Sequence, residues 1–390
     1  MNIGLYCNWK VKPHKNGGFY IPSVHAKYIL AFKKIYKKIF LLSNVGSDEI
    51  NDSDVLIVDD DIHLIELPGF KNYLSALRFS KQIINGINEL TEQCKYIYVR
   101  TPEPLCWFFM FAKNKDKIII NHHFTSNPLD VLLKQKSFFS LKKYIKYIAF
   151  LPEYYLSIIS ACVNNATCNG PSVLKNIPFF LRKRIRILIE NTLTKEELVE
   201  KEYCERTHAG CYNFICVSRL QEGKGLQELI SAFSAFLNKH IDIDAHLTII
   251  GDGPLKKCLE VQVATLSVSN RITIQGYVQN GEPLNEFYRN AHFLINPSLS
   301  ETGPRVILEA MSEGCVCLST DVGYVRYILS QEPVFDSLII RSDFERQFCL
   351  IAKELCVNKE LYTELSMKSF FIAQKYSLDS FVENIFIGQE

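Results

Sequence analysis

Apolar positions in the carboxyl-terminal half of the chain follow two alternating spacings. Short β-rich apolar runs predict strands, and between them apolar residues recur every three or four positions, as on one face of a helix. Leu226, Leu229, Ile230 and Phe233 form one such face. Strands alternating with helices predict right-handed βαβ units and a parallel sheet. The expected strands are 214–218, 246–250, 271–275, 292–296, 315–319 and 337–340, and the expected helices are 226–237, 255–266, 283–290 and 304–313.

The amino-terminal half alternates in the same way, but less regularly. A charged stretch between 191 and 213 separates the two halves. We therefore predict two α/β domains of similar size, 1–200 and 205–375, with parallel sheets facing a central cleft. Open parallel sheets bind ligands at the carboxyl ends of their strands. The expected amino-terminal strands are 2–7, 39–42, 55–58, 96–100 and 117–121, and the expected helices are 23–34 and 73–90.

Composition narrows the function. The 390 residues carry a formal charge of +2, which argues against a nucleic-acid-binding protein. The 13 cysteines are scattered without paired metal spacing, so we expect buried thiols in a reducing cytosol. No uninterrupted apolar stretch reaches the length of about 18 residues expected of a membrane span. The amino terminus resembles a first strand rather than a signal peptide.

A glycine-containing loop follows the expected strand 214–218. It reads Val-Ser-Arg-Leu-Gln-Glu-Gly-Lys-Gly over 217–225 and precedes a helix. Glycines let backbone approach a ligand, and a helix start offers free N–H groups to an anion. Arg219 and Lys224 add positive charges that suit a diphosphate. A solvated loop with ordinary surface cations is the alternative. A second glycine turn, Gly-Asp-Gly-Pro at 251–254, is by itself only a turn signal.

Two glutamates bracket another expected helix start. Glu301 precedes Gly303 and Pro304, which we expect to begin the helix, and Glu309 lies in its second turn. Carboxylates accept hydrogen bonds from sugar hydroxyls, and the helix start can meet a phosphate. Both glutamates could instead be ordinary helix charges. Glu309, however, sits in an apolar turn, where a carboxylate needs a partner.

The order of these motifs resembles the retaining glycosyltransferases of family four, which have the GT-B fold of two Rossmann-like domains. The resemblance is strong over about 205–330 and weaker, but in order, over the amino-terminal half. It rests on Ser-Arg-Leu with Gly-Lys-Gly, Gly-Asp-Gly-Pro, Gly-Tyr-Val at 276–278 and the spacing of Glu301 and Glu309. It also implies that a last helix, at about 376–390, packs back on the first domain.

The resemblance implies a role for each candidate residue. Arg219 and Lys224 would hold the donor diphosphate as it leaves, Glu309 would bind the nucleotide ribose, and Glu301 would bind the donor sugar. The remaining positions are the phosphate-binding segment Thr302, Gly303 and Pro304, the base neighbours Tyr277 and Val278, Gly18 beside the diphosphate, and His122, or its neighbour His123, at the reacting sugar.

Two further segments have competing interpretations. Asp59-Asp60-Asp61 could bind a metal, but a solvated loop is the better interpretation, and we expect neither metal nor cofactor. Residues 134–160 mix lysines with apolar and aromatic residues. This segment could lie on an anionic membrane surface, on the inner face, or be an ordinary amphipathic helix.

We therefore predict a cytoplasmic retaining glycosyltransferase. It would move a sugar from a nucleotide-sugar to the hydroxyl of a glycan or lipid-linked acceptor, in bacterial surface polysaccharide or glycolipid assembly. The alternatives are a nucleotide-sugar epimerase of the same fold and a non-catalytic nucleotide-sugar-binding protein. An epimerase would release an isomerised nucleotide-sugar, whereas a transferase releases nucleoside diphosphate only with an acceptor.

Overall fold

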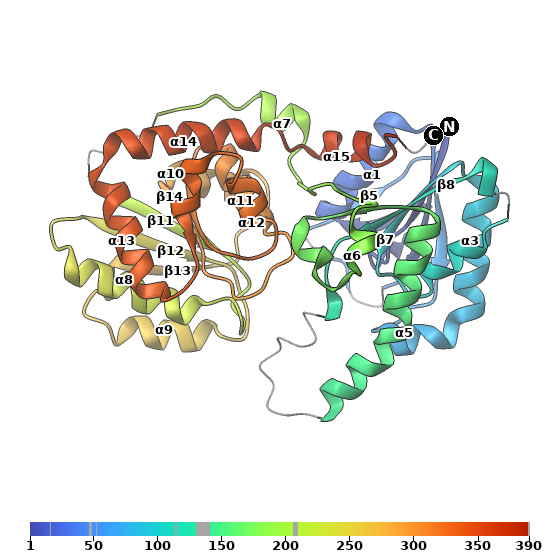
Figure 1. Cartoon of the computed structure of the whole chain (residues 1–390), viewed down its shortest axis with the longest axis horizontal. Coiled ribbons are helices and arrows are strands. Elements are labelled where there is room, and N and C mark those ends of the chain that lie inside the picture. Colours follow the sequence, from blue (N-terminus) through green and yellow to red (C-terminus); the bar gives the residue numbers. More distant parts are fainter. Residues whose placement is uncertain are drawn as a thin grey trace. The chain divides into compact units, whose positions relative to one another are not determined.

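The chain divides into two units, shown in a computed structural model that describes residues 1–15, 17–46, 49–51, 53–113, 115–129, 141–205 and 210–388 (Figure 1). Unit 1 is Met1–Thr194 with Leu378–Glu390, and unit 2 is Lys195–Ser377. The division lies slightly before the predicted limit at residue 200. The carboxyl-terminal segment from Leu378 belongs to unit 1.

Unit 2 is built on a six-stranded, wholly parallel sheet with the order β13-β12-β11-β14-β15-β16. Its central strands are buried because helices cover both faces of the sheet (Figure 1). Each predicted strand is present within a few residues of its expected bounds. The strands are β11 (Tyr212–Val217), β12 (Ala245–Ile250), β13 (Ile272–Gly276), β14 (Phe293–Asn296), β15 (Val316–Thr320) and β16 (Ile339–Ile340).

The helices of unit 2 pack apolar faces onto this sheet. Helix α8 (Leu226–Lys239) presents the predicted face, and its Phe233 and Phe236 meet Phe214 of β11 and Phe348 of α13. These rings form the centre of one core. The remaining helices are α7 (Lys195–Val199), α9 (Lys256–Ala264), α10 (Glu282–Asn290), α11 (Arg305–Ser312), α12 (Val325–Leu329), α13 (Phe344–Val357) and α14 (Lys359–Ala373).

Unit 1 contains a seven-stranded parallel sheet with the order β10-β9-β8-β7-β1-β4-β6. Strand order reverses between β1 and β7, because the chain first builds outward from β1 through β4 and β6 and then continues on the other side. The strands are β1 (Asn2–Tyr6), β4 (Lys38–Asn44), β6 (Ile62–Leu67), β7 (Tyr96–Thr101), β8 (Ile119–Phe124), β9 (Asn165–Cys168) and β10 (Ile185–Ile187).

Two amino-terminal expectations need correction. The run at 55–58 is not a strand of the parallel sheet: β5 (Asp54–Ile57) pairs antiparallel with β3 (Phe19–Pro22), which pairs with β2 (Lys12–Pro13). The helix expected at 73–90 is interrupted. Asn72 caps α2 (Tyr73–Ala76), a 3₁₀ turn follows, and α3 (Ser80–Gln93) then begins. Strand β6 was not predicted.

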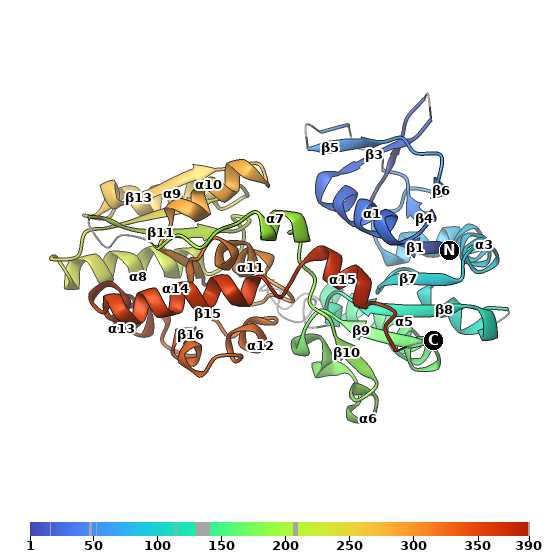
Figure 2. The same cartoon turned by 90° about the horizontal axis from the view of Figure 1, so that it is seen from above.

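Helices cover both faces of the first sheet as well (Figure 2). Helix α1 (Ser23–Ile35) and the carboxyl-terminal α15 (Leu378–Asn384) share one core, so the last helix does pack on unit 1. Lys34 Nζ contacts Asp379 Oδ1 at 2.8 Å, and Leu378 N donates to Leu193 O at 2.8 Å. Helices α3 and α5 (Leu141–Val163) pack with strands in two other clusters, and the short α6 (Phe179–Arg182) precedes β10.

Helix α5 covers most of the described part of segment 134–160. Residues 130–140 lie outside the described residues, so contact with a membrane stays a prediction. Ile145 and Ile148 are exposed beside Lys146, whereas Tyr154 and Ile158 are buried. Within the described ranges, no helix combines the length and apolar character needed to cross a bilayer.

Phe381 joins α15 to unit 1. Its ring is 1% exposed and lies 5.0 Å from the His123 ring and 6.3 Å from that of Tyr98. We expect Phe381→Ala to lower the free energy of unfolding of unit 1 by about 3–5 kcal/mol, because it removes a buried ring and leaves a cavity.

Urea denaturation followed by tryptophan fluorescence measures this, since the 2 tryptophans, Trp9 and Trp107, both lie in unit 1. Phe179→Ala, at a ring that is 75% exposed, is the matched control. Equal midpoints for both variants would contradict the packing of α15.

Candidate active site

Four loops meet at the carboxyl edge of the second sheet because glycines let their backbones touch. A Cβ on Gly225 (φ +65°) would lie 2.1 Å from the carbonyl oxygen of Pro297. A Cβ on Gly251 would lie 1.9 Å from Ser218 O, and one on Gly323 would lie 2.6 Å from Thr302 O. The loops after β11, β12, β14 and β15 are therefore fixed to one another. Of the two glycines in the loop predicted to admit a ligand, Gly225 is already needed for contact between the loops, whereas a Cβ on Gly223 would meet nothing within 4 Å.

Lys224 and Glu301 meet across this edge. The Lys224 ammonium contacts Glu301 Oε1, and the hydroxyl of buried Ser298 donates to the same oxygen at 3.0 Å. The two residues belong to the loops after β11 and β14, which are neighbouring strands. Strand order reverses between these two strands, the place where open α/β sheets bind ligands. Two residues separated by 77 positions are thus paired at a ligand-binding edge.

Arg219 and Tyr277 lie at the same edge with exposed side chains. Arg219 precedes Leu220, whose N–H donates to Asp252 O at 2.9 Å. Tyr277 follows Gly276, whose carbonyl oxygen accepts from Gly251 N at 2.8 Å. Val278 is half-buried next to it. Because these backbone contacts fix the loops, both exposed side chains are anchored at their bases.

Helix α11 begins one residue later than expected. Pro304 is its N-cap rather than its first residue, and no side chain caps this end. Thr302 and Gly303 are half-buried just before it. A helix start without a side-chain cap keeps its N–H groups available to a ligand oxygen.

Glu309 is buried on α11, at 7% exposure, and accepts a hydrogen bond from Tyr288 Oη at 3.2 Å. Burial and then the Glu309 charge raise the pKa of Tyr288 well above its usual value, so Tyr288 stays a donor. This partner satisfies the expectation that a carboxylate in an apolar turn is paired. Tyr288 itself was not predicted, although it lies in the expected helix 283–290.

His122 lies inside unit 1, fully buried on β8. Its Nδ1 is 3.1 Å from Thr101 Oγ1 and its Nε2 is 3.0 Å from Ser160 Oγ of α5. Both ring nitrogens therefore have partners within the unit. Desolvation by burial lowers the pKa of His122 to about 3, so the ring is neutral near pH 7.

His123 faces the opposite side of the strand, toward a buried polar group. Its Nδ1 is 2.8 Å from Thr167 Oγ1, and its Nε2 is 3.6 Å from Glu190 Oε1, which also accepts from Arg100 at 3.2 Å. Arg100 ends the predicted strand 96–100, and Glu190 lies shortly after β10. Their pairing was not predicted, because nothing in the sequence links two positions 90 residues apart.

Gly18 lies in the hairpin between β2 and β3. A Cβ there would sit 2.2 Å from Ile57 O of β5, at a φ of +77°. Contact with β5 is therefore enough to require glycine at this position. No ligand contact is needed to explain the glycine, and its role beside a diphosphate stays a prediction.

The Asp59–Asp61 segment forms ion pairs rather than a carboxylate cluster. Lys33 Nζ lies 3.1 Å from Asp59 Oδ1 and 3.0 Å from Asp61 Oδ2. Across the parts of the chain that the structure describes, no three His, Cys, Asp or Glu side chains gather as a metal site would require.

Comparison with known proteins assigns the carboxyl-terminal half. Residues 211–351 match the family described as glycosyl transferases group 1. An uncharacterized glycosyltransferase of Methanocaldococcus jannaschii is 34% identical over 116 residues, which cover 30% of this chain and 29% of that relative. A second uncharacterized glycosyltransferase of this organism is 25% identical over 374 residues, or 94% of this chain and 95% of the relative. These matches support the prediction of a glycosyltransferase.

Solved structures extend the similarity to both units. The Anabaena protein HepE, crystallised in complex with UDP, superposes with a TM-score of 0.67 at 14% identity, covering 98% of each chain. At this identity the likeness shows the fold alone. It confirms the predicted GT-B fold of two Rossmann-like domains.

Neither His122 nor His123 should titrate between pH 5 and pH 7.5. Burial lowers the pKa of both rings, to about 3 and about 4, below the usual value of 6.5. Imidazole Cε1–H shifts in two-dimensional NMR, assigned with His122→Gln and His123→Gln, measure this directly. A ring that titrates near pH 6.5 would show that it is exposed to solvent.

Proposed function

We propose that this chain transfers a sugar from a nucleotide-sugar donor to an acceptor hydroxyl, with retention of anomeric configuration. The observation that carries the proposal is the Lys224–Glu301 pair, placed at the switch point of the second sheet by loops that glycines fix together. The family match over 211–351 and the UDP bound by HepE support a nucleotide-sugar as the donor.

The donor diphosphate would lie between cations and helix starts. Arg219 can fork onto two phosphate oxygens, whereas Lys224 acts as a point charge. Helices α8 and α11 both begin at this edge without side-chain caps, so their N–H groups add partial positive charge. Preorganised donors of this kind stabilise the charge that develops on a leaving diphosphate.

The Lys224–Glu301 contact would change when the donor binds. The Lys224 ammonium has three N–H donors, and a diphosphate oxygen competes for them with the carboxylate. As Lys224 turns toward the phosphate, Glu301 gains free lone pairs for hydroxyls of the donor sugar, while Ser298 still positions it. The ion pair thus holds both side chains in place before the donor arrives.

Glu309 would bind the nucleotide ribose. The Tyr288 hydroxyl occupies one oxygen, Oε2, and fixes the carboxylate plane. A carboxylate has roughly four lone-pair sites, so Glu309 can accept from ribose hydroxyls while it holds Tyr288. Tyr277 and Val278 are the side chains proposed to lie against the base.

Retention fits the absence of a free acid and base among these groups. In the proposed complex Glu301 accepts from hydroxyls of the donor sugar, and Glu309 is held by Tyr288. Two carboxylates that flank a scissile bond as nucleophile and acid, as in glycoside hydrolases, are not what this edge offers. Electrostatic stabilisation of the departing diphosphate is the contribution that its residues can make.

The candidate histidines would support the site as neutral residues. A neutral ring that donates from a fixed nitrogen can hold a sugar hydroxyl without exchanging protons. His122 has both nitrogens engaged, whereas His123 Nε2 has only a 3.6 Å neighbour in Glu190. Both rings are fully buried, so contact of either one with the substrate stays a prediction.

Replacing either cation should slow transfer strongly while the chain stays folded. We expect Lys224→Ala and Arg219→Ala each to lower kcat by about 10²–10³, as is typical when one donor to a developing charge is removed. The donor is first chosen as the nucleotide-sugar that raises the melting temperature of the chain most. The measurement is then the release of nucleoside diphosphate from this donor, with and without acceptor.

Lys257→Ala, at an exposed lysine of α9, is the matched control. An isomerised nucleotide-sugar among the products would favour an epimerase instead. Tight donor binding without turnover on any acceptor would contradict the enzymatic proposal.

A further inference from the structure

Unit 1 has its own cavity, of about 240 Å³, at the carboxyl edge of its sheet. Its lining comes from the end of β4, from the segments that follow β1, β6 and β7, and from α5. The strand order reverses between β1 and β7, so the cavity lies at the switch point of this sheet. Its size is slightly below the roughly 300–1,000 Å³ of drug-sized sites and suits a group the size of one sugar ring.

Two carboxylates are built into the wall of the cavity. Glu153 of α5 is 1% exposed and accepts from Leu105 N and from Trp107 Nε1, both at 2.7 Å. Glu103 accepts from the backbone N–H of Asn8 at 3.0 Å and from its side-chain amide. Glu103 is only half-buried, so its remaining lone pairs can accept from a hydroxyl in the cavity.

Backbone strain is concentrated around the same cavity. Among the residues described, Lys10, Leu105 and Asp343 are the three with a side chain at positive φ. Lys10 (φ 55°) lines the cavity and is held by Oδ1 of buried Asn44, which accepts from its N–H at 3.1 Å. Leu105 (φ 58°) follows a lining residue and donates to Glu153. Such conformations persist only where surrounding contacts impose them, and they cluster at functional sites.

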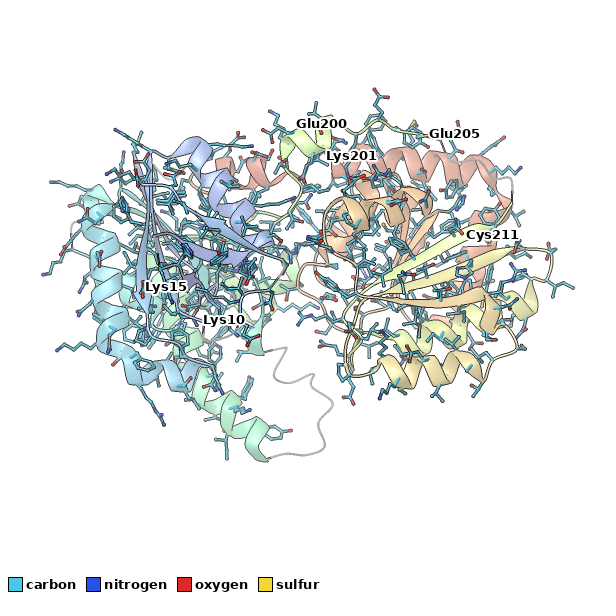
Figure 3. The ribbon with its side chains drawn as sticks, turned by 180° about the vertical axis from the view of Figure 1, so that it is seen from behind. Lys10, Lys15, Glu200, Lys201, Glu205 and Cys211 are labelled. Carbon is cyan, nitrogen blue, oxygen red and sulfur yellow. The ribbon has the colours of Figure 1, made fainter. Side chains whose placement is uncertain are left out.

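The cavity carries positive charge. Lys10 (labelled in Figure 3) and Lys71 both line it with exposed side chains, and no described residue pairs with either ammonium group. Burial raises the pKa of Glu103 and of Glu153 to about 7, so these carboxyl groups are partly protonated near neutral pH. The positive charge of the two lysines is therefore only partly neutralised by the two carboxyl groups.

Aromatic side chains complete the wall. The rings of Tyr73 and Phe150 pack edge to face at 5.6 Å, and Phe70 lines the cavity beside them. Ligand sites commonly combine an apolar wall with a few convergent polar groups. Here the polar groups are carboxylate and amide acceptors for hydroxyls, and two ammonium groups for an anion.

We infer that this cavity binds the acceptor, and that the acceptor is a sugar or other polyol carrying a phosphate group. Lys10 and Lys71 would hold the phosphate; a phosphomonoester, with a charge of about −1.5 to −2, matches two ammonium groups, and a phosphodiester carries less charge. Glu103 and Asn8 would accept from or donate to the hydroxyls, and Tyr73 and Phe150 would lie against the ring. This inference rests on the proposed function, since it names the second substrate of the same reaction.

Calorimetric titration of the full chain with glucose 6-phosphate and with glucose tests it. We expect glucose 6-phosphate to bind at least about tenfold more tightly than glucose, and the double variant Lys10→Gln/Lys71→Gln to lose that difference. Lys81→Gln, at an exposed lysine of α3 outside the cavity, should bind as the wild type does. A second arm uses phosphatidylcholine vesicles with and without phosphatidylinositol.

Lysine-dependent binding of glucose 6-phosphate indicates a free sugar phosphate, and lysine-dependent binding of the phosphatidylinositol vesicles alone indicates a lipid headgroup. Both outcomes support the inference. It is overturned if neither probe binds, or if the double variant binds both as the wild type does. UDP is titrated in parallel: it should bind wild type and double variant equally, and its failure to bind would count against the proposed function instead.

Discussion

The close approach of loop backbones at the edge of the second sheet is the constraint on which the candidate donor site depends. Gly225, Gly251 and Gly323 each place backbone where a Cβ would overlap a carbonyl oxygen of another loop. That contact sets where Lys224 stands relative to Glu301. A side chain at any of these positions would separate the loops and, with them, the two charges. The glycines therefore act on the chemistry through the position of their neighbours.

The two glutamates of the candidate donor site differ in the partners that hold them. Glu301 pairs with a cation that can exchange its partner, so its contacts can change when an anion arrives. Glu309 is buried and pairs with a tyrosine whose raised pKa keeps it a neutral donor. One carboxylate is thus poised to rearrange, and the other is fixed. This difference fits a site that must hold a nucleotide firmly while the sugar bond is broken.

Sequence reasoning located the strands and helices of unit 2 because buried parallel strands and amphipathic helices have distinct periods. It failed in unit 1 where local signals were weak or misleading. The apolar run at 55–58 forms an antiparallel edge strand, and β6, with mostly half-buried residues, gives no clear pattern. The motifs that contain Lys224 and Glu301 could be recognised in the sequence, but partners such as Tyr288 could not. The cavity of unit 1 was invisible in the sequence, because it is assembled from segments far apart along the chain.

A crystal structure of the chain with UDP would show directly whether the proposed donor site binds a diphosphate. We expect the diphosphate at the carboxyl edge of the second sheet, with Lys224 Nζ moved from Glu301 onto a phosphate oxygen and the ribose hydroxyls on Glu309. A diphosphate bound elsewhere, or bound here with the Lys224–Glu301 contact unchanged, would contradict it.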